Sequence, residues 1–153
     1  MKLILSSRHF LAALIALCLI CCSVVFIAYY AVYRLVYARD YVMYGKMHSE
    51  VAHEVREELL KHRDLKQITF SASDGVKLSG FFFYRPGAKA ALLVCHGYRG
   101  CKEFMYGFLD MFPDYHILMF DFRAHGQSDG IITSIGCNEY KDVIGAAEYL
   151  QHA

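Results

Sequence analysis

Two short stretches of the sequence hold residue types that perform or support chemistry. The first, LLVCHGY, spans residues 92–98, and the second, DFRAHGQSDG, spans residues 121–130. Each contains or closely follows an apolar run that is typical of a strand buried in a mostly parallel sheet. In the second stretch, a histidine, a serine and an aspartate occur within five residues, and these are the residue types of nucleophilic catalysis. The two stretches are therefore the candidate functional loops.

The second loop contains a G-x-S-x-G pattern at residues 126–130, centred on Ser128, which is the pattern of a nucleophile elbow. A working elbow is a sharp turn directly between a strand and a helix. Here three residues separate the preceding strand from Gly126, and no helical pattern begins at the serine. Members of a catalytic triad normally come from separate elements, whereas His125 lies close to Ser128 in sequence. We therefore predict that both residues support the loop, with Ser128 as nucleophile kept as the alternative.

The elements before the first loop predict a hairpin. Residues Gln67–Ser71 and Leu78–Tyr84 have the composition of strands, and the Ser-Asp-Gly sequence at 73–75 is a turn signal. Upstream, Ser49 to about Leu65 has helical composition and a favourable Glu57–Lys61 pair. Its apolar side is predicted to comprise Val51, Val55, Leu59 and Leu60.

The elements around the two loops alternate between strand and helix. Ala90–Cys95 and His116–Phe122 are apolar strands, and a helix between them is indicated by apolar residues at helical spacing over 104–112, ended by Pro113. After a loop over 123–136, Asn138 can cap a last helix. Its predicted inner face comprises Tyr140, Val143, Ile144, Ala147 and Leu150. A hairpin followed by strand–helix–strand–helix predicts an α/β architecture with its site at the carboxyl ends of the strands.

With these motifs in this order, the chain over about residues 66–151 resembles the N-terminal half of an α/β-hydrolase. More narrowly, it resembles membrane-anchored members related to serine aminopeptidase and monoacylglycerol-lipase-like enzymes. In that family one strand ends in His-Gly, and the next ends in a D-x-R-x-H-G-x-S-x-G loop. The matching residues of the second motif are Asp121, Arg123, His125, Gly126, Ser128 and Gly130.

The resemblance implies a role for the first loop. The backbone N–H of Tyr98 would be one donor of the oxyanion hole, which stabilises negative charge on the acyl oxygen. Gly97 lets the main chain approach the substrate, and His96 braces the loop, with catalysis as its alternative role. Asp121, Arg123, His125, Gly126 and Ser128 would support the loops.

The family places its nucleophile after a fifth strand, and its acid and histidine after later ones. The chain is therefore expected to lack all three and to be inactive alone, as the N-terminal portion of a membrane-anchored serine hydrolase acting on an ester, thioester or amide. A non-catalytic membrane-anchored interaction protein is the alternative. No cofactor is expected, because serine acyl transfer needs none.

An uncharged run of 24 residues, 10–33, precedes this domain. As a helix it reaches about 36 Å, which exceeds a hydrocarbon core of about 30 Å. We predict a single-pass membrane protein anchored in the lipid bilayer; cleavage of this run as a signal is the alternative, and flanking charges leave the orientation open. The predicted parts are an N-terminal flank (1–9), a transmembrane helix (10–33), a juxtamembrane and connecting helix (34–65) and a truncated hydrolase domain (66–153).

The remaining composition excludes other classes of function. Residues 50–153 carry 11 basic and 14 acidic side chains, which gives no reason to expect a nucleic-acid partner. No metal-ligand spacing, phosphate loop or dinucleotide motif occurs. The disulfide status of Cys95, Cys101 and Cys137 stays open at this stage.

Overall fold

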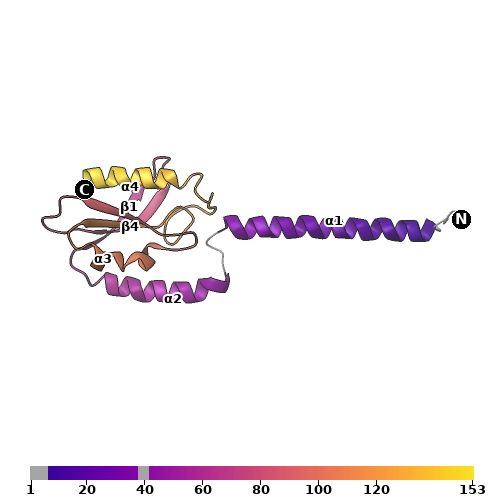
Figure 1. The fold of residues 1–153 in the computed structure, drawn as a ribbon, viewed down its shortest axis with the longest axis horizontal. Coiled ribbons are helices and arrows are strands. Elements are labelled where there is room, and N and C mark those ends of the chain that lie inside the picture. The colour runs from indigo at the N-terminus through magenta and orange to yellow at the C-terminus, as the bar shows by residue number, and fades with distance from the viewer. Residues whose placement is uncertain (1–6, 38–41) are drawn as a thin grey trace. The chain divides into compact units, whose positions relative to one another are not determined.

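The computed structural model describes the chain at residues 7–37 and 42–153, in two compact units, Met1–Leu35 and Val36–Ala153. The first unit is built on one helix, α1 (Ser7–Val36) (Figure 1). Its uncharged run contains no glycine or proline to interrupt the helix, and the side chains of residues 8–32 are exposed. The hydroxyl of Ser23 donates to the carbonyl of Leu19 at 2.8 Å, so this polar group is satisfied within the helix.

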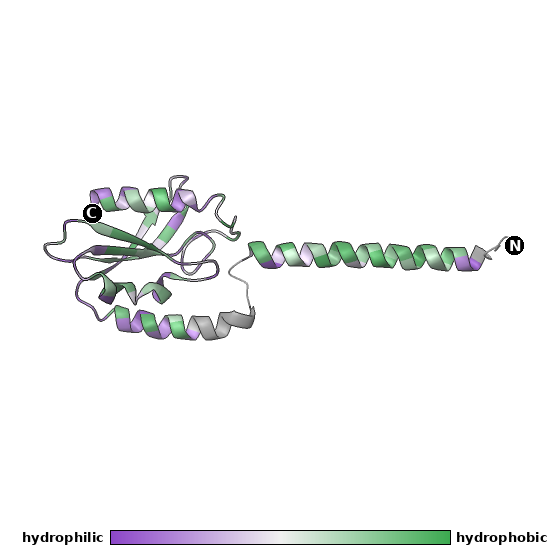
Figure 2. Cartoon of the chain, in the orientation of Figure 1, coloured by the Kyte–Doolittle hydropathy of each residue, from purple (hydrophilic) through white to green (hydrophobic). Residues whose placement is uncertain are grey.

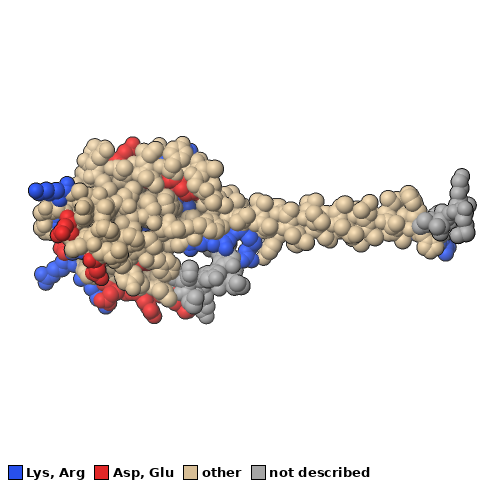
Figure 3. All heavy atoms as spheres, viewed as in Figure 1, with Lys and Arg blue, Asp and Glu red and all other residues tan. Residues whose placement is uncertain are grey.

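By length and composition α1 is able to cross a membrane. It is apolar along most of its length (Figure 2), and Figure 3 shows no Lys, Arg, Asp or Glu along its middle. The candidate span runs from Arg8 to Val36, slightly longer than the predicted 10–33.

The second unit contains a four-stranded sheet in the order β1-β2-β4-β3. Strands β1 (Leu65–Ser71) and β2 (Lys77–Phe83) form the predicted antiparallel hairpin. Strand β4 (His116–Phe120) pairs antiparallel with β2 and parallel with β3 (Ala91–Cys95). The prediction of mixed α/β architecture is confirmed.

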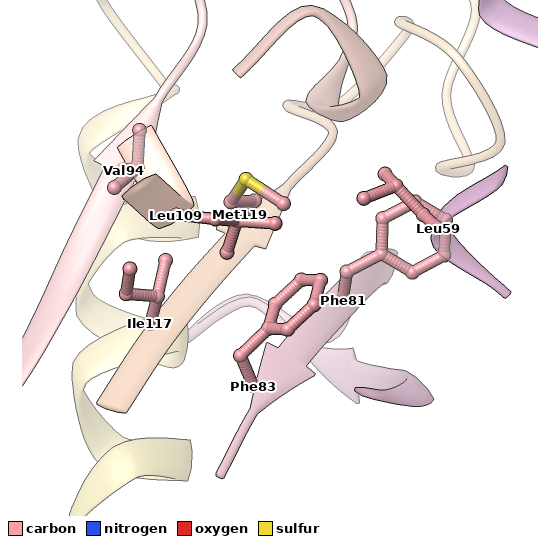
Figure 4. Close-up of a cluster of buried hydrophobic side chains, with 7 residues drawn as sticks. All are labelled: Leu59, Phe81, Phe83, Val94, Leu109, Ile117 and Met119. Atoms are coloured by element: carbon pink, nitrogen blue, oxygen red, sulfur yellow. The ribbon is translucent and has the colours of Figure 1, made fainter. Parts of the chain in front are cut away.

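Helices cover both faces of this sheet (Figure 1). One face carries α2 (Val42–Leu59), a 3-10 turn η1 (Lys102–Met105) and the short α3 (Phe108–Met111); the other carries α4 (Tyr140–His152). Successive residues of β4 point to opposite faces and are buried in two separate clusters. The first cluster comprises Leu59, Phe81, Phe83, Val94, Leu109, Ile117 and Met119 (Figure 4). The second comprises Phe70, Ala72, Leu78, Phe82, Leu118, Phe120 and Ala146.

The predicted connecting helix over 49–65 is wrong at both ends, since α2 begins at Val42 and ends at Leu59. After Leu59 the chain turns, because β1 pairing with β2 already begins at Leu65. The predicted apolar side holds for Leu59 and partly for Val55, whereas Val51 and Leu60 are exposed. Lys61 pairs with Glu58 at 2.6 Å instead of with Glu57.

The predicted helix over 104–112 is instead divided into η1 and α3, with Gly107 between them. Lys102 and Glu103, at the start of η1, are held by buried ion pairs described below. The segment ends before Pro113, as predicted.

Strand β3 was predicted to be covered on both faces. In the described sheet it lies at an edge, and of its five residues only Val94 is buried. Strand β4, with a neighbour on each side, is the strand that fits the prediction, although it ends at Phe120 and not at Phe122.

The last helix turns a different face inward from the one predicted. Gly145 approaches the hairpin so closely that a Cβ there would lie 2.3 Å from the carbonyl oxygen of Ser71. This contact turns Asp142 and Ala146 inward and leaves Tyr140, Ile144 and Ala147 exposed, while Val143 and Leu150 are half-buried. The residue before the helix is Glu139, not Asn138, and it makes no side-chain capping bond.

Candidate functional site

The two candidate loops lie side by side, because β3 and β4 are parallel and paired from Ala91 with His116 to Cys95 with Phe120. The carboxyl ends of the two strands therefore lie at the same end of the sheet, and both loops begin there. Two histidines connect the loops. The backbone N–H of Phe122 donates to Nε2 of His96 at 3.1 Å, and that of Arg99 donates to Nε2 of His125 at 3.2 Å.

The remaining ring nitrogens of these histidines are also hydrogen-bonded. Nδ1 of His96 donates to the carbonyl of Gly97 at 2.7 Å, and Nδ1 of His125 donates to that of Arg123 at 2.9 Å. Because each Nε2 accepts a backbone N–H, each ring is in the neutral Nδ1–H form. Burial lowers the pKa of His96, which favours that form. Neither ring has a nitrogen left to act as a general base.

Asp121, at the start of the second loop, binds both that loop and the segment that follows the first loop. Its buried carboxylate accepts the backbone N–H of Lys102 at 2.8 Å, the Nζ of Lys102 at 2.6 Å and the backbone N–H of Gln127 at 2.9 Å. The second loop passes so close to this carboxylate that a Cβ at Gly126, where φ is +46°, would lie 2.3 Å from it. Only glycine fits this position without displacing the carboxylate.

Lys102 is a buried cation that the sequence analysis did not identify. Its Nζ lies 3.1 Å from Oε1 of Gln127, 3.3 Å from Oε1 of Glu103 and 4.9 Å from the centre of the Phe81 ring. Glu103 in turn accepts from Nη2 of Arg56 at 2.6 Å, which ties η1 to α2. Burial opposes ionisation of Glu103, but Lys102 and Arg56 outweigh it and lower its pKa. A Lys-Glu pair after a loop looks like a solvated helix start, so the sequence held no signal for this cluster.

Arg123 joins the second loop to helix α4 and to the turn of the β1–β2 hairpin. Its Nε donates to Oδ1 of Asp142 in α4 at 2.9 Å, and its Nη1 donates to Oδ2 of Asp74 in the hairpin turn at 3.0 Å. The guanidinium lowers the pKa of Asp74. Sequence analysis identified Arg123, but it took Asp74 as a turn residue and did not place Asp142 in the interior.

Ser128 is 1% exposed. Its hydroxyl donates to the carbonyl oxygen of Asp121 at 2.5 Å and accepts the backbone N–H of Ser79 at 2.9 Å, so it joins the second loop to β2. A hydroxyl buried between two backbone partners is poorly placed to attack an acyl carbon.

Glu139 organises the segment that follows the second loop, a role that the sequence analysis missed. Its carboxylate accepts the hydroxyl of Thr133 at 2.8 Å and the backbone N–H groups of Ser134 and Gly136 at 2.8 and 2.7 Å. Although burial raises its pKa, these bonds outweigh burial and lower the pKa to about 2. The spacing of a carboxylate after a Thr-Ser-x-Gly turn was the available signal.

A pocket of about 200 Å³ lies between the loops at this edge. Its lining includes residues of the first loop, Gly97 and Tyr98 among them, and residues of the segment that Glu139 holds. The lining residues are His96, Gly97, Tyr98, Phe122, His125, Thr133, Ile135, Gly136 and Glu139. The pocket is large enough for a small acyl group.

Cysteine and metal chemistry find little support in the part of the chain that the structure describes. Its cysteines are free thiols, and burial raises the pKa of Cys95 and raises that of Cys101 to about 12. Neither is therefore a thiolate near neutral pH. Among the described residues no group of three or more His, Cys, Asp or Glu is arranged to hold a metal.

Comparisons with known proteins identify the fold. No family model and no curated protein matches the chain. Solved structures do: esterase Pf2001 of Pyrococcus furiosus is 28% identical over 63% of the chain, with TM-scores of 0.54 and 0.52 in two crystal forms. An α/β hydrolase from Vibrio vulnificus is 17% identical over 71% of the chain, with a TM-score of 0.52. The chain spans 37–39% of the length of these structures.

Proposed function

Because the second unit forms part of an α/β-hydrolase domain, we propose that the chain is the N-terminal portion of a membrane-anchored serine hydrolase. It carries half of an oxyanion hole, contributed by the backbone at Tyr98, for an ester, thioester or amide substrate. The observation that carries this proposal is the pocket where the two loops meet, which Gly97 and Tyr98 help to line. Backbone donors at the carboxyl edge of a sheet are suited to stabilise an acyl oxyanion.

The attacking group belongs to other polypeptide in this proposal. His96, His125 and Ser128 each have hydrogen-bond partners that fit them to hold the loops together. The cysteine thiols, with raised pKa values at Cys95 and Cys101, do not replace a serine nucleophile. The resemblance places the nucleophile, acid and histidine after strands that would follow α4.

Membrane anchoring is the second element of the proposal. Helix α1 has the length and apolar composition for one crossing, and its exposed side chains, with Ser23 satisfied internally, suit a lipid environment. An anchored enzyme of this kind would act at or near a membrane surface.

The nucleotide sequence beyond codon 153 tests the enzyme proposal. We expect an open frame that encodes a strand followed by G-x-S-x-G, and the extended chain should then react with a fluorophosphonate probe at that serine. A stop codon with nothing hydrolase-like beyond it would contradict the proposal.

The open edge of β3 favours a second candidate function, a non-catalytic membrane-anchored interaction protein. Of the described strands only β4 pairs with β3, which leaves backbone groups on its other side for a strand of another protein. A photo-reactive side chain introduced at the exposed Ala91 of β3 separates the two candidates by cross-linking. A strand from a partner protein would favour interaction, and a strand encoded in the same gene would favour the enzyme.

A further inference from the structure

Three isoleucines of the segment after the second loop are exposed to an unusual degree. The exposed fractions of Ile131, Ile132 and Ile135 are 69%, 50% and 58%. Residues 130–138 carry no charged side chain. Clustered apolar side chains in an uncharged loop mark a surface that binds a partner or a lipid.

The loop is held in the conformation that exposes them. Thr133, between the isoleucines, is buried and bonded to Glu139, which also binds the N–H groups on both sides of Ile135. Ile135 itself has φ of +52°, a conformation that β-branched residues rarely adopt. Strain of this kind persists only where neighbouring bonds impose it, and it clusters at functional segments.

The loop lies at the rim of the pocket, whose lining includes Ile135 and Tyr98. Tyr98 is 46% exposed, and the guanidinium of Arg99 lies 5.0 Å from the centre of its ring. Tyrosine and arginine are residues that favour the headgroup zone of a bilayer.

The second unit is joined to α1 through a short linker that leads into α2. In α2, Arg56 reaches Glu103, next to Lys102 and the end of β4. Shortly after the end of α2, the ring of His62 lies 6.2 Å from that of Phe83, which pairs with Ile117 near the start of β4. Helix α2 therefore begins toward the end of the sheet that carries the two loops and ends toward the opposite end, where β4 begins. Six Cα–Cα steps separate Val36 of α1 from Val42 of α2, a reach of at most about 22 Å.

From this placement we propose that residues 131–135, together with Tyr98, form a lipid-docking surface that seats the mouth of the pocket on a bilayer. The inference deepens the proposed function, on which it rests, by naming lipid as the surrounding from which an acyl substrate would enter. Because the short linker joins the second unit to a candidate membrane span, a bilayer is an apolar phase within reach of this unit.

The chain contains no tryptophan, so a single introduced one reports its own surroundings. We compare Ile131→Trp with Met111→Trp in the full chain, reconstituted into phosphatidylcholine vesicles with and without brominated acyl chains. Met111 is a matched control, since it is 66% exposed. It lies in α3, shortly before the start of β4 and therefore toward the end of the sheet opposite the loops. Ile132→Trp replaces the first reporter if Ile131→Trp does not fold.

We expect brominated lipid to quench most of the Ile131→Trp emission and to shift the unquenched emission to the blue, with little effect on Met111→Trp. Equal quenching of both would show that the unit has no preferred face and would overturn the inference. Quenching of neither would also overturn it, and cross-links through this loop would then assign the surface to a second copy or another protein. Resistance to alkaline extraction tests anchoring by α1 separately, and probe reactivity of the extended chain tests the enzyme.

Discussion

Strands β3 and β4 are both apolar and five residues long, and each ends in a candidate loop, yet their surroundings differ completely. Residues Ile117–Phe120 of β4 are fully buried, whereas β3 is partly exposed and lies at the edge of the described sheet. Burial on both faces therefore depends on the neighbours of a strand, which its own composition does not reveal.

The loops differ in the same way. The loop after β4 is fixed by Asp121, Arg123 and Ser128 to η1, α4, the hairpin turn and β2. The loop after β3 is held mainly by hydrogen bonds to two histidines and by a turn in which the N–H of Gly100 donates to the carbonyl of Gly97, and its residues Gly97 and Tyr98 line a pocket. We take the first arrangement as a rigid support and the second as the half of a site that receives substrate.

The largest expected effect concerns the support. Asp121→Asn leaves the ammonium of Lys102 buried without its closest carboxylate, and should cost about 3–5 kcal/mol of unfolding free energy. Urea unfolding of the detergent-solubilised chain, followed by near-ultraviolet circular dichroism, measures this loss.

Two controls sharpen that prediction. Asp129→Asn, at an exposed position of the same loop, should change the unfolding free energy by less than about 0.5 kcal/mol. The double variant Asp121→Asn with Lys102→Met should be more stable than Asp121→Asn alone. If it is less stable, the ion pair is not the reason for the loss.

The glycines of the two loops should respond differently. Gly126→Ala forces a Cβ against the Asp121 carboxylate and should cost about 1–3 kcal/mol. Gly97→Ala meets nothing within 4 Å and should change the unfolding free energy by less than about 1 kcal/mol. Equal losses in the same urea assay would contradict the distinction between support and open site.

Acid should weaken the two regions in separate pH ranges. The pKa of His96 is lowered by burial, so the folded state favours the neutral ring. Its contribution to folding stability is therefore complete above the ordinary pKa of 6.5 and declines as pH falls below that value. The contribution of the Glu139 carboxylate to folding stability is complete above its ordinary pKa of 4.5 and is lost as pH falls toward its lowered pKa of about 2. Glu139→Gln should remove the lower range while leaving the upper one, as measured by unfolding at a series of pH values.

The smallest effect on stability is expected at the open edge. Ala91→Lys places a charge on exposed β3 and should reduce self-association while changing the unfolding free energy by less than about 0.5 kcal/mol. Sedimentation in detergent measures the association. Gln67→Lys on β1, the opposite edge, is the control, and an equal reduction there would mean that β3 is not the associating edge.

The strands, their order along the chain and the α/β class were predictable, because apolar runs and turn residues are local signals. The resemblance to α/β-hydrolases also predicted that the two loops lie at the same end of the sheet. The inner face of α4 was wrong because it depends on the close contact of Gly145 with Ser71, which no local pattern encodes.

The same limit explains the missed polar residues. Lys102, Glu103, Asp142 and Glu139 have the sequence character of surface side chains, and their burial is made favourable by partners that include residues up to 47 positions away. Ser128 shows the opposite case, in which the sequence carries a motif typical of catalysis while the loop before it favours a supporting role, and that role stays a prediction.

The division between support and open site is tested most directly by treating the membrane-reconstituted chain and its Ser128→Ala variant with a fluorophosphonate probe. We predict no covalent label on either, because the buried Ser128 hydroxyl is bonded to the backbone of Asp121 and Ser79. Labelling of the chain that disappears in Ser128→Ala would make this serine the nucleophile and contradict the account.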